Sequence, residues 1–310
     1  MSNPIDLLQS FDPLADAAAG EPAGPRASGP RPRRYVLLDV FSDSPLQGNQ
    51  LAVFTDGRGL SSELMQRVAR ELNLSETVFV LEPNDAATVA IRIFTPGAEL
   101  PFAGHPVLGS AIVIGAALGL QELVLETRAG PVPVHIEHQH GLIWSGSMHQ
   151  PIPTWAVYDR QPELLAALGL ERSGLPVEVY DNGTRHVYVR VGDEQTLAAL
   201  KPDLRALAEH GAVCANCFAG SAARFKTRMF APALGVPEDP ATGSAAGPLA
   251  VHLARHGAIA FGEEIEIRQG EEIARPSLLR ARVLGSAQAI DQVQVGGAAL
   301  ILGRGDLLLA

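Results

Sequence analysis

Two segments of the chain carry nearly the same residues in the same order, and each ends in groups that could bind or react. The first reads RIFTPGAELPFAGH over residues 92–105, and the second reads RMFAPALGVPEDPATGS over residues 228–244. The copies differ at two positions that could carry chemistry. The last residue is His105 in the first copy and Ser244 in the second, and Asp239 stands where the first copy has Leu100. This duplication predicts two like domains that face each other across one site, with the chemistry in the unmatched residues.

The matched glycines, Gly104 and Gly243, stand where a loop enters an apolar stretch with helical spacing. Glycine lets a backbone approach a ligand closely. The first amides of a helix have no partner within it and carry partial positive charge, so they bind a carboxylate or oxyanion without a Lys or Arg. The sequence therefore predicts two helix N-termini that converge on one anion. The alternative is that Gly and Pro only shape a turn.

The unmatched residues each have a structural and a chemical interpretation. His105 at a helix N-terminus would be neutral and able to accept or relay a proton, although a single His is more often structural. Asp239 has two interpretations. A carboxylate at a helix start is often an ordinary cap, but its occurrence in one copy only points to a functional charge. Ser244 is either a helix-start hydroxyl or a substrate ligand.

Glu76 follows Ser75 in the segment Asn-Leu-Ser-Glu-Thr, between the end of a predicted helix and an apolar strand. A carboxyl at the mouth of an apolar strand is poorly solvated, which raises its pKa towards the range useful for general acid–base catalysis. Taken alone, the residue would be a surface Glu in a turn.

Several other patterns bear on a redox or metal site, a nucleotide-binding site or a hydrolase site, and none supports one. Cys214 and Cys217 form a C-x-x-C, but in a strand residues three apart point to opposite faces, and no second pair of cysteines accompanies them. Four histidines cluster in a hairpin-like region without a frame of carboxylates, and we interpret them as surface residues: His135, His138, His140 and His149. The chain contains no G-x-G-x-x-G after a strand, no Walker loop and no G-x-S-x-G, so nucleotide-binding and hydrolase functions have no support.

The elements that must position these residues follow from hydrophobic periodicity. One helix is predicted from a Ser cap at 61 or 62 to Leu72, and one apolar helix starts near each copy of the motif, at about Pro106 and Ala245. Strands are predicted at residues 35–41, 51–54, 76–82, 87–94, 123–126, 132–138, 142–148, 177–180, 186–191, 213–219, 225–230, 265–268, 278–283 and 292–301. Short helices are expected at 162–168, 194–200 and 204–210. Many short strands around one apolar helix per half predict an α+β fold of two barrels, each with a central helix.

We expect residues 1–34, rich in Ala, Pro and Gly, to be a flexible extension. Residues 35–150 would form an N-terminal domain and residues 151–297 a C-terminal domain. The last strand, about residues 298–310, is a candidate to return to the first domain.

The composition limits the partners. The net charge of −10 and pI of about 5.4 argue against nucleic acid or an anionic membrane surface. No apolar run reaches the roughly 18–20 residues of a membrane span, and no signal peptide pattern opens the chain. Two cysteines make no disulfide scaffold, so we expect a cytoplasmic protein.

The assembled motifs resemble the PhzF family of phenazine-biosynthesis isomerases, in the diaminopimelate-epimerase fold superfamily. The resemblance covers about residues 34–310. It is carried by PLQGN at 45–49, the segments 65–76, 92–109 and 150–155, NCFAG at 216–220, and the long stretch 235–256.

The resemblance implies two pseudo-symmetric domains, a homodimer without cofactor or metal, and the substrate trans-2,3-dihydro-3-hydroxyanthranilic acid. It implies that Glu76 moves a proton from C3 to C1, and that His105, Asp239 and Ser244 complete the catalytic set. Asn49, Ser75, Gly104 and Gly243 are the expected substrate-binding residues.

Three alternatives remain: a related isomerase or epimerase acting on another small amino-carboxylate, a two-base amino-acid racemase, and a binding protein that keeps the fold. The racemase of the resembled superfamily needs a thiol on each side of the cleft, whereas here the motif positions carry His105 and Ser244 and both cysteines lie elsewhere.

Overall fold

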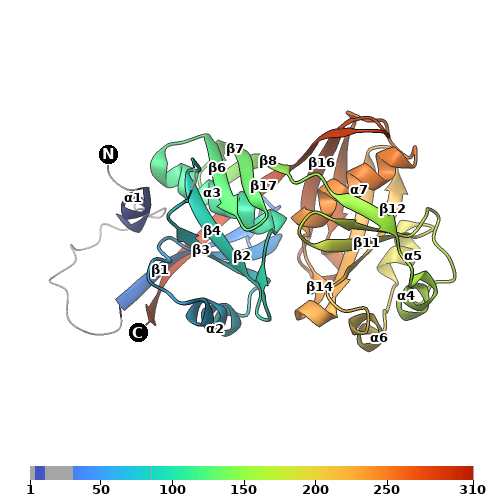
Figure 1. Ribbon diagram of the computed structural model, residues 1–310, viewed down its shortest axis with the longest axis horizontal. Coiled ribbons are helices and arrows are strands. Elements are labelled where there is room, and N and C mark those ends of the chain that lie inside the picture. Colours follow the sequence, from blue (N-terminus) through green and yellow to red (C-terminus); the bar gives the residue numbers. More distant parts are fainter. Residues whose placement is uncertain (1–3, 11–30, 85, 310) are drawn as a thin grey trace.

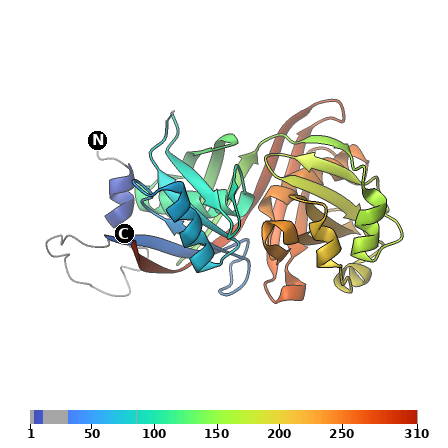
Figure 2. The same ribbon diagram turned by 60° about the horizontal axis from the view of Figure 1, so that its bottom comes forward.

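The computed structural model describes residues 4–10, 31–84 and 86–309. The chain forms two halves that lie side by side, each a set of strands curved around one long helix (Figure 1). Figure 2, turned by 60°, shows the same two halves with shorter helices on their outer surfaces. None of the helices in the described ranges is long and apolar enough to cross a membrane.

The first half is a closed barrel of eight strands in the order β1, β2, β3, β4, β6, β7, β8, β17 and back to β1. β2 and β3 pair in parallel, as do β4 and β6, whereas the other neighbours are antiparallel. The bounds are β1 Arg31–Val40, β2 Asn49–Phe54, β3 Glu76–Leu81, β4 Val89–Phe94, β6 Glu122–Thr127, β7 Gly130–His140 and β8 Ile143–Gln150, with a short strand β5 Glu99–Leu100 beside β4.

Helix α3, Gly104–Leu118, runs through this barrel, and every residue from Gly104 to Gly115 is buried. A helix that is apolar on all sides is stable only when surrounded, and here strands of the barrel surround it. It ends at Gly119, whose left-handed backbone (φ 68°) suits glycine. The amphipathic helix α2, Ser62–Leu72, covers the outside of the barrel and begins at the predicted cap, Ser61.

The second half repeats this plan around helix α7, Gly243–Arg255. Its strands are β9 Thr154–Val157, β10 Glu178–Asp181, β11 Arg185–Arg190, β12 Cys214–Ser221, β13 Arg224–Ala231, β15 Glu264–Gln269 and β16 Ser277–Gly285, with the short β14 Val236–Asp239 beside β13. Three short helices lie on its outer side: α4 Gln161–Leu168, α5 Glu194–Ala198 and α6 Leu204–Ala208. Single 3₁₀ turns occur at Pro232–Leu234 and Glu271–Ile273.

Strand β17, Ile290–Leu309, belongs to both halves. It pairs with β16 near its start, with β8 from Val293 to Leu300, and with β1 as far as Leu309. The sequence predicted a strand at 292–301 and, as a candidate, a last strand at about 298–310 that returns to the first domain; the structure joins the two in one strand. The longer strand exists because β1 supplies partners for the whole C-terminal segment.

The N-terminal region differs in part from the expected flexible extension. Pro4–Ser10 is helix α1, in which Ile5 and Leu8 are buried and pack with the core around α3, while Asp6 pairs with Arg58 at 2.9 Å. β1 begins at Arg31, four residues before the predicted strand, because β17 pairs with it there. Residues 1–3 and 11–30 lie outside the described part of the chain.

Candidate active site

The N-termini of α3 and α7 meet at the matched glycines. A Cβ atom on Gly104 would lie 2.4 Å from the carbonyl carbon of Gly243, and one on Gly243 would lie 2.9 Å from the backbone nitrogen of His105. Both distances are shorter than any side chain permits, so only glycine allows this approach. Neither N-cap residue, Ala103 or Thr242, bonds the first amides with its side chain. The two positive helix ends therefore face one small cavity, as the duplication predicted.

Glu76 and His105 form a buried pair at this cavity. Glu76 is the first residue of β3, and its Oε2 lies 3.1 Å from Nε2 of His105 in the first turn of α3. Within the described residues, neither atom makes a well-angled hydrogen bond, so both remain available to a ligand. Burial, and then the charge of Asp239, raise the pKa of Glu76 well above its usual range. Burial lowers the pKa of His105 to about 3, so the ring is neutral.

Asp239 joins the two halves through its carboxylate. Asn49 Nδ2, from β2, donates to Asp239 Oδ1 at 2.9 Å and to the carbonyl of Ala241 at 2.9 Å, and lies 3.2 Å from His105 Nδ1. Thr242 Oγ1 donates to Oδ2 at 2.6 Å. Burial raises the pKa of Asp239, although hydrogen bonds from Thr242, Asn49 and Ser75 oppose the rise. The carboxylate is thus a fixed part of the site and caps no helix.

Ser244 lies on the other side of the cavity, in the first turn of α7. Its Oγ is 3.1 Å from Nε2 of His186 on β11, and its carbonyl accepts from Asn182 Nδ2 at 2.9 Å. Burial lowers the pKa of His186 to about 3. Sequence patterns gave no indication of His186, because it follows Arg185 near the start of a strand, with no motif around it, and meets Ser244 only in the folded chain.

The cavity thus collects residues from both copies of the motif and from β3, β11 and β12. Glu76, His105, Asp239, Ser244, Gly104 and Gly243 all line it. Asn49 and Ser75 stand behind Asp239. The remaining lining residues are Thr95, Leu100, Ala103, Thr184, His186, Cys214, Met229, Ala231, Leu234, Val236 and Thr242.

Cys214 is another residue that sequence patterns did not place here. The strand registers show which position of the second half corresponds to Glu76. The residue after Glu76, Thr77, pairs with Phe94. In the same way, the residue after Cys214, Ala215, pairs with Phe230. Phe94 and Phe230 match in the duplicated motif, so Cys214 stands where Glu76 stands in the other half. Burial raises the pKa of the Cys214 thiol, and Asp239 and Glu76 raise it further. Cys217, on the opposite face of β12, packs in the core of the second half, as its spacing predicted.

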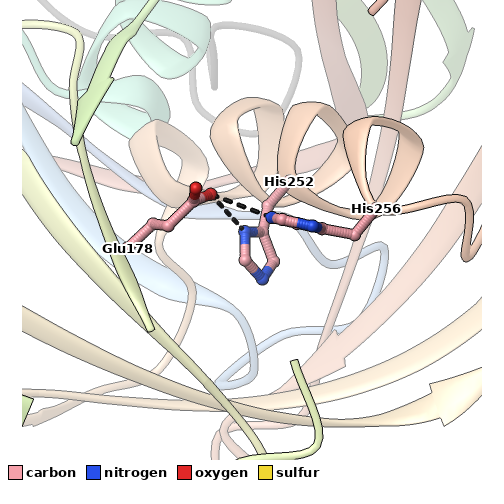
Figure 3. A group of neighbouring side chains, drawn as sticks. All are labelled: Glu178, His252 and His256. Carbon is pink, nitrogen blue, oxygen red and sulfur yellow. Dashed lines mark hydrogen bonds and ion pairs between the residues drawn. The ribbon is translucent and has the colours of Figure 1, made fainter. Parts of the chain in front are cut away.

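A second polar cluster lies at the C-terminal end of α7 (Figure 3). Glu178 Oε2 is 3.0 Å from His256 Nε2 and 3.4 Å from His252 Nδ1, an arrangement that could suit a metal ion. The same oxygen accepts from Arg255 Nη1 at 2.8 Å and from the Tyr180 hydroxyl at 2.8 Å. A cation here would lie beside the Arg255 guanidinium, which already compensates the carboxylate. We therefore assign the cluster to structural support of α7 against β10.

A wider groove lies elsewhere on the described part of the chain, and none of Glu76, His105, Asp239 or Ser244 lines it. It is lined by β7, β8, β15, β16 and β17, and by His135 and His140 among others. These two histidines are exposed, as are His138 and His149, in agreement with the prediction of surface residues.

The family model described as phenazine biosynthesis-like protein (PhzC-PhzF) matches residues 38–305. The chain belongs to this family. It is 53% identical over 275 residues to a trans-2,3-dihydro-3-hydroxyanthranilate isomerase of Pseudomonas chlororaphis, covering 89% of this chain and 99% of the relative. The isomerase of the same name in Pseudomonas aeruginosa is 55% identical over 264 residues, with 85% and 95% covered.

Among solved structures, a predicted epimerase from Pseudomonas aeruginosa has a TM-score of 0.77 at 34% identity, covering 90% of this chain and all of that one. This chain has the α+β fold that the sequence predicted, with strands curved around a central helix in each half, as in diaminopimelate-epimerase-like proteins.

Proposed function

We propose that this protein is an isomerase that converts trans-2,3-dihydro-3-hydroxyanthranilic acid to 6-amino-5-oxocyclohex-2-ene-1-carboxylic acid, in phenazine biosynthesis. The observation that carries the proposal is the buried Glu76–His105 pair, at 3.1 Å, in a cavity between two helix N-termini. Relatives more than half identical carry the name of this activity.

In this proposal Glu76, as the carboxylate, takes the proton from C3 and returns it to C1. The product is an enol that relaxes to the amino-ketone, so no atom is gained or lost and no second base is needed. A raised pKa suits this role, because a carboxylate that holds its proton tightly is the stronger base. Burial of the pair also keeps the transferred proton away from water.

The other residues would hold the substrate in place. Neutral His105 and Asp239 would bind the hydroxyl and amino groups, and Ser244 with the amides at Gly104 and Gly243 would hold the carboxylate. Asn49 and Ser75 would fix Asp239, since Asn49 bonds it at 2.9 Å and Ser75 also bonds its carboxylate. The family resemblance extends the proposal to a cytoplasmic homodimer that works without a cofactor; sedimentation of the purified protein tests the dimer.

The direct test is to incubate the purified protein with substrate carrying deuterium at C3 and to follow the reaction by NMR. We expect coloured condensation products, and a substantial share of the label at C1 of the first product. Complete loss of the label to water would contradict transfer by one enclosed carboxyl. No reaction at all would refute the proposed substrate.

A second candidate is an epimerase of another small amino-carboxylate that uses Glu76 and Cys214 on opposite sides of the cavity. The observation in its favour is that Cys214 occupies the position equivalent to Glu76. Against it, the pKa of a thiol already lies above neutral pH and burial raises it further, so Cys214 keeps its proton at neutral pH and cannot accept one from a substrate. Deuterium incorporation at Cα of free amino acids, lost in Cys214→Ala, would favour this candidate.

A further inference from the structure

The side chain of His186 has no part in the reaction outlined above, yet it lines the same cavity as Ser244. It is fully buried, and its Nε2 lies 3.1 Å from Ser244 Oγ. Which of these two atoms donates decides what Ser244 can offer to a substrate. If the ring nitrogen accepts, the serine proton points away from the cavity and towards the ring.

Asn216 on β12 determines the tautomer of this ring. Its Nδ2 lies 2.9 Å from the carbonyl oxygen of Cys214, which can only accept, so this atom is the amide nitrogen and donates. The same Nδ2 lies 3.3 Å from His186 Nδ1, which must therefore be the acceptor. A neutral imidazole carries one proton, and burial keeps this ring neutral. The proton is consequently on Nε2, directed at Ser244 Oγ.

Ser244, His186 and Asn216 are arranged like the three residues of a hydrolase triad, but their hydrogen bonds run in the opposite direction. In a triad the third residue is a carboxylate that accepts the proton of Nδ1, which leaves Nε2 free to remove the proton from serine. Here an amide donates to Nδ1, so Nε2 donates to serine. Ser244 is thereby prevented from acting as a nucleophile, and its own proton is left for a group in the cavity.

We propose that His186, oriented by Asn216, is a positioning residue that fixes Ser244 as a hydrogen-bond donor to the carboxylate of an amino-carboxylate substrate. The assignment rests on the proposed function for the identity of the substrate. It adds the reason why an uncharged serine serves at this position: its proton is held towards the anion, next to the positive ends of α3 and α7.

The tautomer is tested on the wild-type protein, without reference to activity. Two-dimensional ¹⁵N NMR of histidine-labelled protein should show His186 with a protonated Nε2 and an unprotonated Nδ1, assigned by loss of the signals in His186→Gln. A proton on Nδ1, or a charged ring at neutral pH, would overturn the proposal.

The effect on binding is tested with a matched pair of variants. His186→Phe fills the space without a donor, whereas the amide of His186→Gln can place an N–H near the position of Nε2. We expect His186→Phe to raise KM, and the dissociation constant of 3-hydroxyanthranilate measured by calorimetry, about tenfold, which is the loss of roughly one good hydrogen bond. The change in kcat should be smaller, and His186→Gln should recover most of the affinity.

Two results would contradict this role: equal affinities in wild type and His186→Phe, or equal losses in both variants that follow only their melting temperatures. If either variant does not fold, the NMR result on the wild type still decides the tautomer. If wild type fails to convert the dihydro-hydroxyanthranilate, the proposed function fails, whereas the NMR and calorimetric measurements continue to test His186.

Discussion

The two halves of the molecule share a framework and differ in the residues placed upon it. In the first half Arg92 binds both carboxylate oxygens of Glu99, at 2.7 and 2.6 Å, and its guanidinium lies 5.1 Å from the ring centre of Phe94. In the second, Arg228 binds both oxygens of Glu238 at 2.8 Å and lies 5.0 Å from Phe230. The matched Arg, Phe and Glu thus hold each loop in the same way.

Several positions that differ between the two halves are in contact with the cavity. Glu76 in one half corresponds to Cys214 in the other, and His105 corresponds to Ser244. The first half therefore places a carboxyl and an imidazole at the cavity, and the second places a hydroxyl there with Asp239 beside it. The comparison teaches that the duplicated residues build the cavity. On our proposal, the chemistry comes from the positions at which the two halves differ.

The largest expected effect tests this division at the equivalent strand starts. Glu76→Gln should retain the fold and lower kcat by several orders of magnitude, because an amide cannot accept the proton; a general base alone contributes about 10²–10⁴-fold. Cys214→Ala is the matched control and should stay within about threefold of wild type, since on our proposal the thiol takes no part. Steady-state kinetics and circular dichroism give both answers. Comparable losses in the two variants would show that the halves share the chemistry.

The framework pairs should differ in their contribution to stability. Arg228 also donates to the carbonyls of Leu197, Ala198 and Leu200. Its removal leaves the Glu238 carboxylate, whose side chain is only 12% exposed, with no other ion-pair partner among the described residues. Urea denaturation should show that Arg228→Met costs about 3–5 kcal/mol of the free energy of unfolding.

Arg92→Met is the corresponding change in the first half. It should cost less, because Arg128 also pairs with Glu99, at 2.9 Å, and would remain. A larger loss for Arg92→Met would contradict the difference that we derive from the second cation.

The contact of the two helix N-termini should be sensitive to a single methyl group. Gly104→Ala places a Cβ 2.4 Å from the backbone of Gly243, so the halves must move apart, at a cost of about 1–3 kcal/mol. Activity should fall more than stability, because the cavity lies at this contact. Gly192→Ala, where a Cβ would meet nothing within 4 Å, is the control. An unchanged kcat/KM in Gly104→Ala would show that the approach is not required.

The smallest expected effect concerns the polar cluster at the end of α7. Burial alone would raise the pKa of Glu178, but hydrogen bonds from His252, His256, Arg255 and Tyr180 outweigh it and lower that pKa. The charged carboxylate therefore stabilises the fold above its unfolded pKa of about 4.3, and this contribution is lost as the pH falls through the lower folded value.

Glu178→Gln tests this contribution. It should cost about 1–3 kcal/mol at pH 7 and progressively less below about pH 4.3, as measured by chemical denaturation across pH. A penalty that is constant with pH would show that the charge is not what stabilises the cluster.

Much of the fold followed from the sequence because its signals are local. The cap at Ser61, the apolar helices after Gly104 and Gly243, and most strands rest on periodicity and on turn residues near in sequence. His186 and Cys214 could not be placed in this way, since their neighbours in the cavity come from distant segments. Gly303 and Gly305 weaken the strand pattern in the last part of β17, which forms a strand because β1 pairs with it.

The path of β17 has a consequence for synthesis of the protein. The first strand of the barrel in the first half, β1, begins at Arg31. The barrel is closed by β17, which pairs with β1 as far as Leu309. On the ribosome, the half that emerges first must wait, with an open edge between β1 and β8, until β17 has been made. Closing so distant a pair is slow, and an unpaired edge exposed meanwhile invites association with other chains. The half made first is thus completed last, so nascent chains should depend on chaperones most strongly until β17 has emerged.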